Sequence, residues 1–506
     1  MTSVESTLGK LKQMDYTENG ALGYKSSGRA LLDLNFRAAS LRGAEESEIC
    51  ELFMAAFAED ELLALKWLFF ARDIRGGLGE RNLFRVILKH LAQMRPMLVE
   101  KLIPLVQEYG RFDDLLPLLN SACSEAVIAY IGTTLAADVE KMKAGKPISL
   151  LAKWLPSVNT ASQASRRMGR GIAAQLKLSE RNYRKTLSGL RRYIDVTERK
   201  MSAGEWPLID YSRVPSRASL LYRAAFYRHD EERYRDFISR VADGTAKMNA
   251  AALFPHDIIH QYVSGGWRVR LDDFSPELEA LWANLPNTVS SEQRILVVRD
   301  GSGSMTTSIA DSRVSALDCS TALAIYFAEH MSGQFKDKFV TFSRVPKLID
   351  LSACTSLHDK LMLTYREDDC SNTDIHAVFR LILKSAVDHH ISQEEMPASI
   401  LIISDMEFDG HRFTWEQPLF EAISAEYEAQ GYKLPKLIFW NLSSRTKIVP
   451  LTQNPLGVIL VSGFSLHIAK MVMSAQLDPY KALVEILLSD RYSNISSNLF
   501  RCIQQS

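Results

Sequence analysis

The chain has 506 residues, more than one compact core holds, so roughly two or three domains are expected. Its hydrophobic content of 46% and charged content of 24% are ordinary globular values, and Lys plus Arg equals Asp plus Glu at 60 each, so net charge alone indicates no partner. There is no N-terminal signal segment and no apolar run near the ~18 residues that a membrane span needs. Together with six scattered cysteines, this favours a cytoplasmic protein with free thiols and no membrane contact.

The first half of the chain is predicted to be helical. Residues 1–44 are mixed and are expected to pack on the helical region that follows. From Glu45 onward apolar residues recur at helical spacing through about residue 145. The glycine-rich stretch 72–81 lacks a preceding strand and a Gly-Lys-Ser/Thr sequence, which indicates a tight turn between two helices rather than a phosphate loop. Paired antiparallel helices in a HEAT-like α-solenoid are expected, although no clean repeat period is present.

Residues 151–200 hold 12 Lys or Arg against 3 Asp or Glu. An apolar stripe on one helical face is formed by Leu176, Tyr183, Leu187, Leu190 and Ile194. The candidate RNA-binding cations cover the adjacent face and its upstream extension: Arg166, Arg167, Arg170, Lys177, Arg181, Arg184, Lys185, Arg191 and Arg192. Such a surface suits a phosphate backbone. Alternatively, it is a solvated face paired with acids on a neighbouring segment.

Residues 201–290 are again predicted to be helical, with aromatic residues interleaved among arginines. The aromatic residues are Tyr211, Tyr222, Phe226, Tyr227, Tyr234, Tyr262 and Trp267. Aromatic rings beside arginines can stack on unpaired bases. The commoner role for such residues is in a core with a polar tip. The predicted helical domain spans residues 45–290.

From Arg294 the apolar pattern changes period, and residues 291–506 are predicted to form a second domain. The short apolar runs are 295–298, 338–342, 400–403, 436–440 and 457–461. Amphipathic helical stretches alternate with them at 312–332, 375–390, 415–430 and 464–474, and a final helix runs over 479–489. This alternation predicts an open parallel sheet with helices on both faces, so the fold class is α followed by doubly wound α/β. Ligands of such sheets bind at the carboxyl ends of the strands.

A divalent-cation pattern directly follows the first of these strands. Its oxygen-bearing residues are Asp300, Ser302 and Ser304, and the glycines between them allow a tight loop. Further oxygens are offered by Thr373 and by Asp405, which follows another apolar run. Together these loops resemble the von Willebrand factor A fold with its metal-ion-dependent adhesion site. The resemblance implies that these five residues hold Mg²⁺ or Mn²⁺.

One position departs from that family. The residue before the first aspartate is usually apolar there, and here it is Arg299. The change removes no ligand, but it places a positive charge near the metal loop.

Nearly the whole chain resembles the family catalogued as domain of unknown function 2828. The motifs that carry the match are 17–21 (TENGA), 71–81 (ARDIRGGLGER), 214–217 (VPSR), 254–257 (FPHD), 439–442 (FWNL) and 462–465 (SGFS). The order of a helical region and a metal domain is also similar to the Ro autoantigen (TROVE) family. That likeness implies a helical ring that binds small noncoding and misfolded RNAs.

We therefore expect a non-enzymatic, Ro-like scaffold that binds structured or single-stranded RNA through the basic helical domain. The alternative is a metal-dependent protein adhesion module, in which a partner carboxylate completes the coordination of the ion. Two observations argue against an enzyme. Ser302 lacks the Gly-x-Ser-x-Gly elbow, and His256 and His260 lack the accompanying Glu of a metalloprotease.

Overall fold

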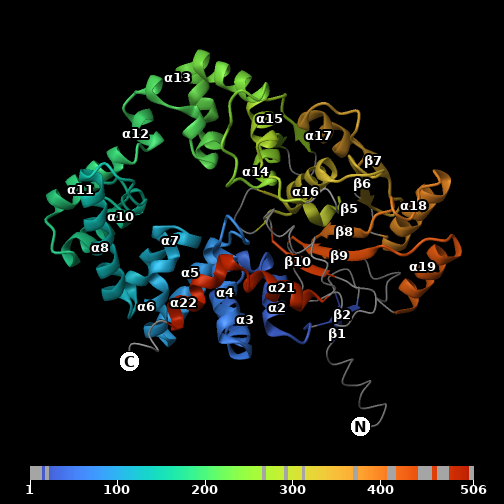
Figure 1. The fold of residues 1–506 in the computed structure, drawn as a ribbon, viewed down its shortest axis with the longest axis horizontal. Coiled ribbons are helices and arrows are strands. Elements are labelled where there is room, and N and C mark those ends of the chain that lie inside the picture. The colour runs from blue at the N-terminus through green and yellow to red at the C-terminus, as the bar shows by residue number, and fades with distance from the viewer. Residues whose placement is uncertain are drawn as a thin grey trace, which may run out of the picture. The chain divides into compact units, whose positions relative to one another are not determined.

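The computed structural model describes ten segments of the chain, drawn in colour in Figure 1. They are residues 14–16, 22–24, 26–264, 269–289, 294–309, 314–368, 374–406, 417–442, 459–463 and 478–500. The chain divides into two compact units. The sheet unit comprises Met1–Ala64 with Arg240–Leu487, and the helical unit comprises Leu65–Ser239 with Leu488–Ser506. The sequence predicted three continuous ranges, 1–44, 45–290 and 291–506, with boundaries where the hydrophobic periodicity changes. Each compact unit instead combines two stretches that are far apart in the sequence.

A six-stranded sheet organises the sheet unit, in the order β10-β9-β8-β5-β6-β7. Its strands are β5 (Ile295–Asp300), β6 (Lys338–Phe342), β7 (Leu348–Asp350), β8 (Ser399–Ser404), β9 (Lys436–Asn441) and β10 (Ile459–Ser462). All neighbours are parallel except β6 and β7. The chain order reverses at β5, which places a topological switch point between its two neighbours. The predicted parallel sheet is confirmed. The three-residue edge strand β7 was not predicted, because three residues carry too little pattern.

Helices cover both faces of this sheet. On one face, alternate strand residues such as Leu296 and Val298 pack with α18 (Ile375–Asp388) and α19 (Gln417–Ala429). On the other, α16 (Ala316–His330) packs against the central strands, with Phe327 in edge contact with Trp440 at 6.0 Å between ring centroids. The doubly wound fold is therefore confirmed.

The remaining elements of the sheet unit lie around this sheet. They are β1 (Met14–Tyr16), β2 (Leu22–Tyr24), α2 (Ala30–Arg37), η1 (Ser40–Gly43), α3 (Glu46–Glu59), α14 (Pro255–Ile259), β3 (Val263–Ser264), β4 (Arg270–Leu271), α15 (Pro276–Ala283), η6 (Gly303–Thr306), α17 (Leu357–Arg366) and α21 (Pro479–Leu487). Helix α2 packs on α3 and also on the edge strand β10, and Asn441 Nδ2 at the end of β9 donates to the Phe36 carbonyl at 3.1 Å. The N-terminal segment therefore packs on helix α3, as expected, and also contacts the sheet. The predicted helix 464–474 lies outside the described residues.

In its described part, the helical unit contains helices only. Its elements are α4 (Glu61–Arg72, which begins in the sheet unit), α5 (Arg81–Met94), α6 (Pro96–Leu102), η2 (Ile103–Leu105), α7 (Val106–Tyr109), η3 (Phe112–Asn120), α8 (Ser124–Lys143), α9 (Leu151–Trp154), α10 (Gln163–Gln175), α11 (Glu180–Tyr193), α12 (Thr197–Ser202), η4 (Trp206–Leu208), η5 (Tyr211–Arg213), α13 (Ser216–Ala242), η8 (Asp490–Tyr492) and α22 (Ser493–Phe500). A HEAT-like repeat stays a prediction.

The glycine-rich stretch 72–81 forms the predicted turn between α4 and α5. A Cβ on Gly77 would lie 1.9 Å from the Phe70 carbonyl oxygen, so the turn admits no side chain there. The buried carboxylate of Asp73 accepts hydrogen bonds from Arg491 Nε at 2.6 Å, from Arg491 Nη2 at 2.8 Å and from the Tyr492 hydroxyl at 3.2 Å. The polar residues of this stretch thus hold the helical unit together rather than a phosphate.

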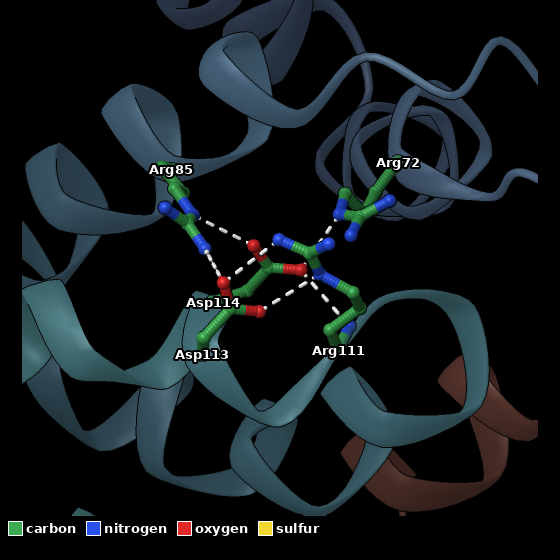
Figure 2. A network of polar contacts seen from close by, with 5 residues as sticks. All are labelled: Arg72, Arg85, Arg111, Asp113 and Asp114. Carbon is green, nitrogen blue, oxygen red and sulfur yellow. Dashed lines mark hydrogen bonds and ion pairs between the residues drawn. The ribbon is translucent and has the colours of Figure 1, made fainter. Parts of the chain in front are cut away.

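A second ion-pair network lies beside this turn (Figure 2). The fully buried carboxylate of Asp114 accepts from Arg72 Nε at 2.7 Å, from Arg85 Nε at 2.6 Å and from the Arg111 backbone amide at 2.9 Å. Asp113 binds the Arg111 guanidinium through both carboxylate oxygens. The network joins α4, α5 and η3, which are separated by up to 42 residues in the sequence.

The aromatic residues of 201–290 are mostly core residues. Tyr211, Phe226 and Tyr234 are buried and pack with ring centroids 4.9 to 5.4 Å apart. Tyr262 is also buried, and Trp267 lies outside the described residues. Base stacking by the buried rings is therefore excluded. Across the described residues, no helix is long and apolar enough to cross a membrane.

Candidate metal centre and basic surface

The predicted metal loop begins where the central strand β5 ends. The Asp300 side chain is buried, and its Oδ1 accepts from the Ser302 amide at 2.9 Å while its Oδ2 accepts from Ser404 Oγ at 2.5 Å. The hydroxyls of Ser302 and Ser304 lie 3.0 Å apart. The first loop thus brings one carboxylate and two hydroxyl oxygens to the carboxyl end of the sheet.

Burial raises the pKa of Asp300, while hydrogen bonds from Ser404 and Ser302 oppose that rise. A carboxylate withdrawn from water is destabilised in its charged form, and a cation beside it reverses that effect. A carboxylate with hydroxyl oxygens is a donor set that Mg²⁺ and Mn²⁺ accept. The residues present therefore fit a hard divalent ion.

The other two predicted ligands come from later loops. Asp405 is buried and directly follows β8, whose residues Ile403 and Ser404 lie beside the end of β5. Thr373 lies outside the described residues. Within the described segments, no three His, Cys, Asp or Glu residues cluster as a metal site, and the predicted set holds only two carboxylates.

Sequence reasoning missed the serines that fix the aspartate. Ser404 binds its carboxylate, and Ser320 Oγ of α16 donates to the Asp300 carbonyl at 3.0 Å. Ser404 carries a usable signal, because it lies between the predicted strand 400–403 and Asp405. Ser320 carries no such signal, because nothing in the sequence distinguishes it from the other small residues of a buried helix.

Arg299 is fully buried beneath the loop, with an exposed fraction of 0%. Its Nε donates to Thr321 Oγ1 at 2.9 Å and its Nη2 pairs with Asp368 Oδ2 at 3.0 Å, while Nη1 has no hydrogen-bond partner among the residues that the structure describes. The guanidinium also lies 5.6 Å from the centre of the Tyr365 ring. The positive charge expected near the loop is thus present, and it is paired with the carboxylate of Asp368.

The predicted basic helix over 176–194 begins only at Glu180, and its upstream extension lies on a separate helix. Helix α10 ends at Gln175 and α11 begins at Glu180, with Lys177 in the left-handed region at φ 56°. The prediction that Leu176 and Lys177 belong to this helix is wrong because Ser179 caps its start, the Ser179 side chain accepting from the Asn182 amide. Tyr183, Leu187 and Leu190 are buried as the apolar stripe requires.

Six of the nine predicted cations are exposed and make no ion pair or hydrogen bond through their side chains with the described residues. They are Arg167, Lys177, Arg181, Arg184, Lys185 and Arg192. Arg170 pairs with Glu180 at 3.2 Å, and Arg166 Nη2 donates to the Ala161 carbonyl. Among the described residues, Arg170 is therefore the only one of the nine cations that pairs with an acidic side chain, as a paired face requires.

Arg191 departs from the expected surface. Its Nε donates to the Ala152 carbonyl at 2.7 Å and its Nη2 to the Leu155 carbonyl at 2.6 Å. These bonds satisfy carbonyls at the end of the short helix α9. Arg191 is thus turned inward, where it fastens α11 to α9.

His256 and His260, considered above as metalloprotease residues, lie in helix α14 and at its C-terminal cap. His260 Nδ1 lies 3.0 Å from Asp318 Oδ2, and the same carboxylate oxygen accepts from the Ser315 amide at the start of α16. His256 is buried within α14.

Comparison with known proteins finds matches to two family models, to a curated protein and to a solved structure. The model of the family described as domain of unknown function (DUF2828) matches residues 17–132 and 121–295, and the model described as domain of unknown function (DUF7788) matches residues 294–486. The uncharacterized protein L728 of Acanthamoeba polyphaga mimivirus is 27% identical over 517 residues, covering 94% of this chain and 88% of that protein. The crystal structure of the Deinococcus radiodurans Ro (RSR) protein is similar over 89% of this chain and 92% of that chain, at 12% identity and a TM-score of 0.36.

Proposed function

The chain belongs to the family described as domain of unknown function (DUF2828), and from this premise we propose that it is a non-enzymatic scaffold that binds RNA. The basic surface of α10 and α11 provides the contact with RNA, and the sheet unit carries a divalent-metal site. One observation carries the RNA proposal. Six exposed cations of this surface lack a partner among the described residues.

Unpaired cations on adjacent helices favour a polyanion for a physical reason. Each phosphate that a Lys or Arg neutralises releases a condensed counterion, so binding strengthens with the number of free cations. A cation already paired with a carboxylate gains little by exchanging one anion for another. Since the contact is made by charge, we expect little dependence on base sequence and a strong dependence on salt.

The test measures RNA binding by fluorescence anisotropy between 50 and 300 mM salt. For roughly four phosphate contacts to single-stranded RNA, the slope of log K against log salt is expected near −3, from about −0.7 per contact. Changing Arg181 and Arg184 to Gln weakens binding of every sequence alike and makes the slope shallower by about one unit or more. Arg191 is left unchanged because it fastens α9.

A matched control removes two exposed arginines from another helix. The double change Arg228→Gln and Arg235→Gln on α13 alters net charge equally, and it should leave the salt slope close to that of the unchanged protein. If the unchanged protein binds no RNA at 50 mM salt, or if the α11 variant binds with the same slope, the basic surface is a solvated face.

A metal-dependent protein adhesion module is the second candidate, and the buried carboxylate of Asp300 favours it. Asp300, Ser302, Ser304 and Asp405 would hold the ion, and the resemblance to the adhesion site adds Thr373. A bound ion with an open position supplies a Lewis-acidic point that a partner carboxylate can occupy. The hydrogen bonds from Ser302 and Ser404 to Asp300 would hold the loop in place before the partner binds.

Isothermal titration with Mn²⁺ and Mg²⁺ tests the metal site. One binding site is expected, and Asp300→Ala should weaken it at least about tenfold because the charged ligand is lost. Asp350→Ala is the control, since this exposed carboxylate at the end of β7 pairs with Lys338 instead. Equal affinity in the Asp300 variant contradicts the site.

A further inference from the structure

We propose that Arg299 and Asp368 are positioning residues for the metal loop. They form a buttress, defined as this ion pair, that fixes the backbone at Gly301 and through it the two flanking ligand residues, Asp300 and Ser302. The inference rests on the proposed metal site and adds residues that the ligand pattern does not contain.

The first observation is the buried guanidinium. Arg299 has no exposed surface, and Asp368 is its ion-pair partner, with a side chain that is 11% exposed. A buried charge without its partner is strongly destabilising, so the carboxylate of Asp368 is held where it is. Thr321 fixes the guanidinium from α16 through the 2.9 Å hydrogen bond to Nε.

The second observation is the position of that carboxylate. A Cβ built on Gly301 would lie 2.2 Å from Asp368 Oδ1 and 2.8 Å from both Cγ and Oδ2. All three distances are far below van der Waals contact, so the carboxylate occupies the space that any other residue at 301 would need. Asp368 therefore packs directly against the loop backbone between the two ligand positions.

The alternation of side chains along β5 explains why Arg299 acts indirectly. Successive strand residues point to opposite faces, so Arg299 points away from the side of Asp300 and toward α16. Its effect reaches the loop through Asp368 and Gly301. Because Arg299 also neutralises Asp368, the buttress adds no net charge beside the ion.

The decisive variant removes both members of the pair. Replacing a buried ion pair by uncharged residues is often neutral for stability, so Arg299→Met with Asp368→Ala should fold and melt within a few degrees of the unchanged protein. Its Mn²⁺ affinity, measured by isothermal titration, should fall about 10- to 100-fold, as expected when the residues supporting a metal site are lost.

A neighbouring pair that is partly exposed supplies the control. Lys347 and Glu367 are joined at 3.3 Å, with Glu367 adjacent in sequence to Asp368. The double change Lys347→Met with Glu367→Ala removes the same charges and should leave Mn²⁺ affinity unchanged.

A suppressor experiment separates positioning from general packing. Gly301→Ala alone should weaken Mn²⁺ binding at least about tenfold, because the new Cβ collides with the fixed carboxylate. In the Arg299→Met, Asp368→Ala background the collision partner is gone, so the same change should weaken binding less than about threefold. Non-additivity of this size requires that Gly301 and Asp368 act on the same element.

Each result either supports or overturns the buttress. Mn²⁺ binding of the double variant equal to that of the unchanged protein, or effects of Gly301→Ala that are the same in both backgrounds, overturns the buttress while leaving the metal site intact. Absence of Mn²⁺ binding by the unchanged protein overturns the metal site, and the buttress with it.

Discussion

Replacing Asp114 by Asn is expected to be among the most destabilising single changes in the helical unit. The side chain of Asp114 is 0% exposed and that of its partner Arg72 is 5% exposed. Asparagine keeps the shape but removes the charge, which leaves the Arg72 guanidinium buried beside a neutral amide. Figure 2 shows that Arg85 converges on the same carboxylate and would lose its partner as well.

Breaking a buried ion pair on one side destabilises by about 3–5 kcal/mol. For a unit of this size, each kcal/mol lowers the melting temperature by roughly 2–4 °C, so a decrease of roughly 6–20 °C is expected. Arg72→Met should be milder, because Asp114 then keeps its bonds from Arg85 and from the Arg111 amide.

Calorimetry of the unchanged protein and the two variants measures the effect, with Glu140→Gln as control. Glu140 forms an exposed pair with Lys143 on α8, and such pairs contribute little. A melting temperature for the Asp114 variant within 2 °C of the unchanged protein refutes the reasoning. A larger loss in Arg72→Met than in Asp114→Asn does so too.

Four further outcomes are expected. Burial raises the pKa of Asp113, but its arginine partners lower that pKa more, so the pKa lies below its ordinary value. The stability that Asp113 contributes is therefore present above about pH 4 and is lost as pH falls through the folded pKa. In an acid titration, the Asp113→Asn variant should lose less stability than the unchanged protein. Asp73→Ala removes three hydrogen bonds from η8 and should lower the free energy of unfolding by about 2–3 kcal/mol in urea titration. Gly77→Ala should destabilise by more than about 3 kcal/mol in the same assay, because the Phe70 carbonyl occupies the position of the new Cβ. Chelation with EDTA should shift the melting temperature by only a few degrees, and cooperative unfolding in EDTA at room temperature would contradict this.

Local sequence predicts much of the sheet and of the metal loop. The run 295–298 ahead of Arg299 and Asp300 is apolar, so the strand and the loop that follows it can both be predicted from the local sequence. The register of β5 with β8 then brings Ser404 to Asp300, as the rule for carboxyl ends of parallel strands implies.

The features that were not predicted depend on contacts between residues far apart in the sequence. Arg191 looks like any other cation of its helix, and only the carbonyls of Ala152 and Leu155, 39 and 36 residues earlier, turn it inward. The partner of Arg299 lies 69 residues away, and no local pattern connects the two. The helix break at Lys177 was missed because the hydrophobic period continues across it, while the serine cap that causes it is a single residue.

The bond between Asp73 and Arg491 has a consequence for synthesis on the ribosome. The two residues are 418 positions apart, yet the Asp73 side chain is only 1% exposed in the finished structure. At translation rates of ~5–20 residues per second, its partner emerges roughly 20–80 s later. During that interval the nascent turn between α4 and α5 holds a carboxylate without its counter-ion, and η8 and α22 are not yet made. The helical unit therefore completes its folding after the sheet strands have been translated, although most of its own residues precede them.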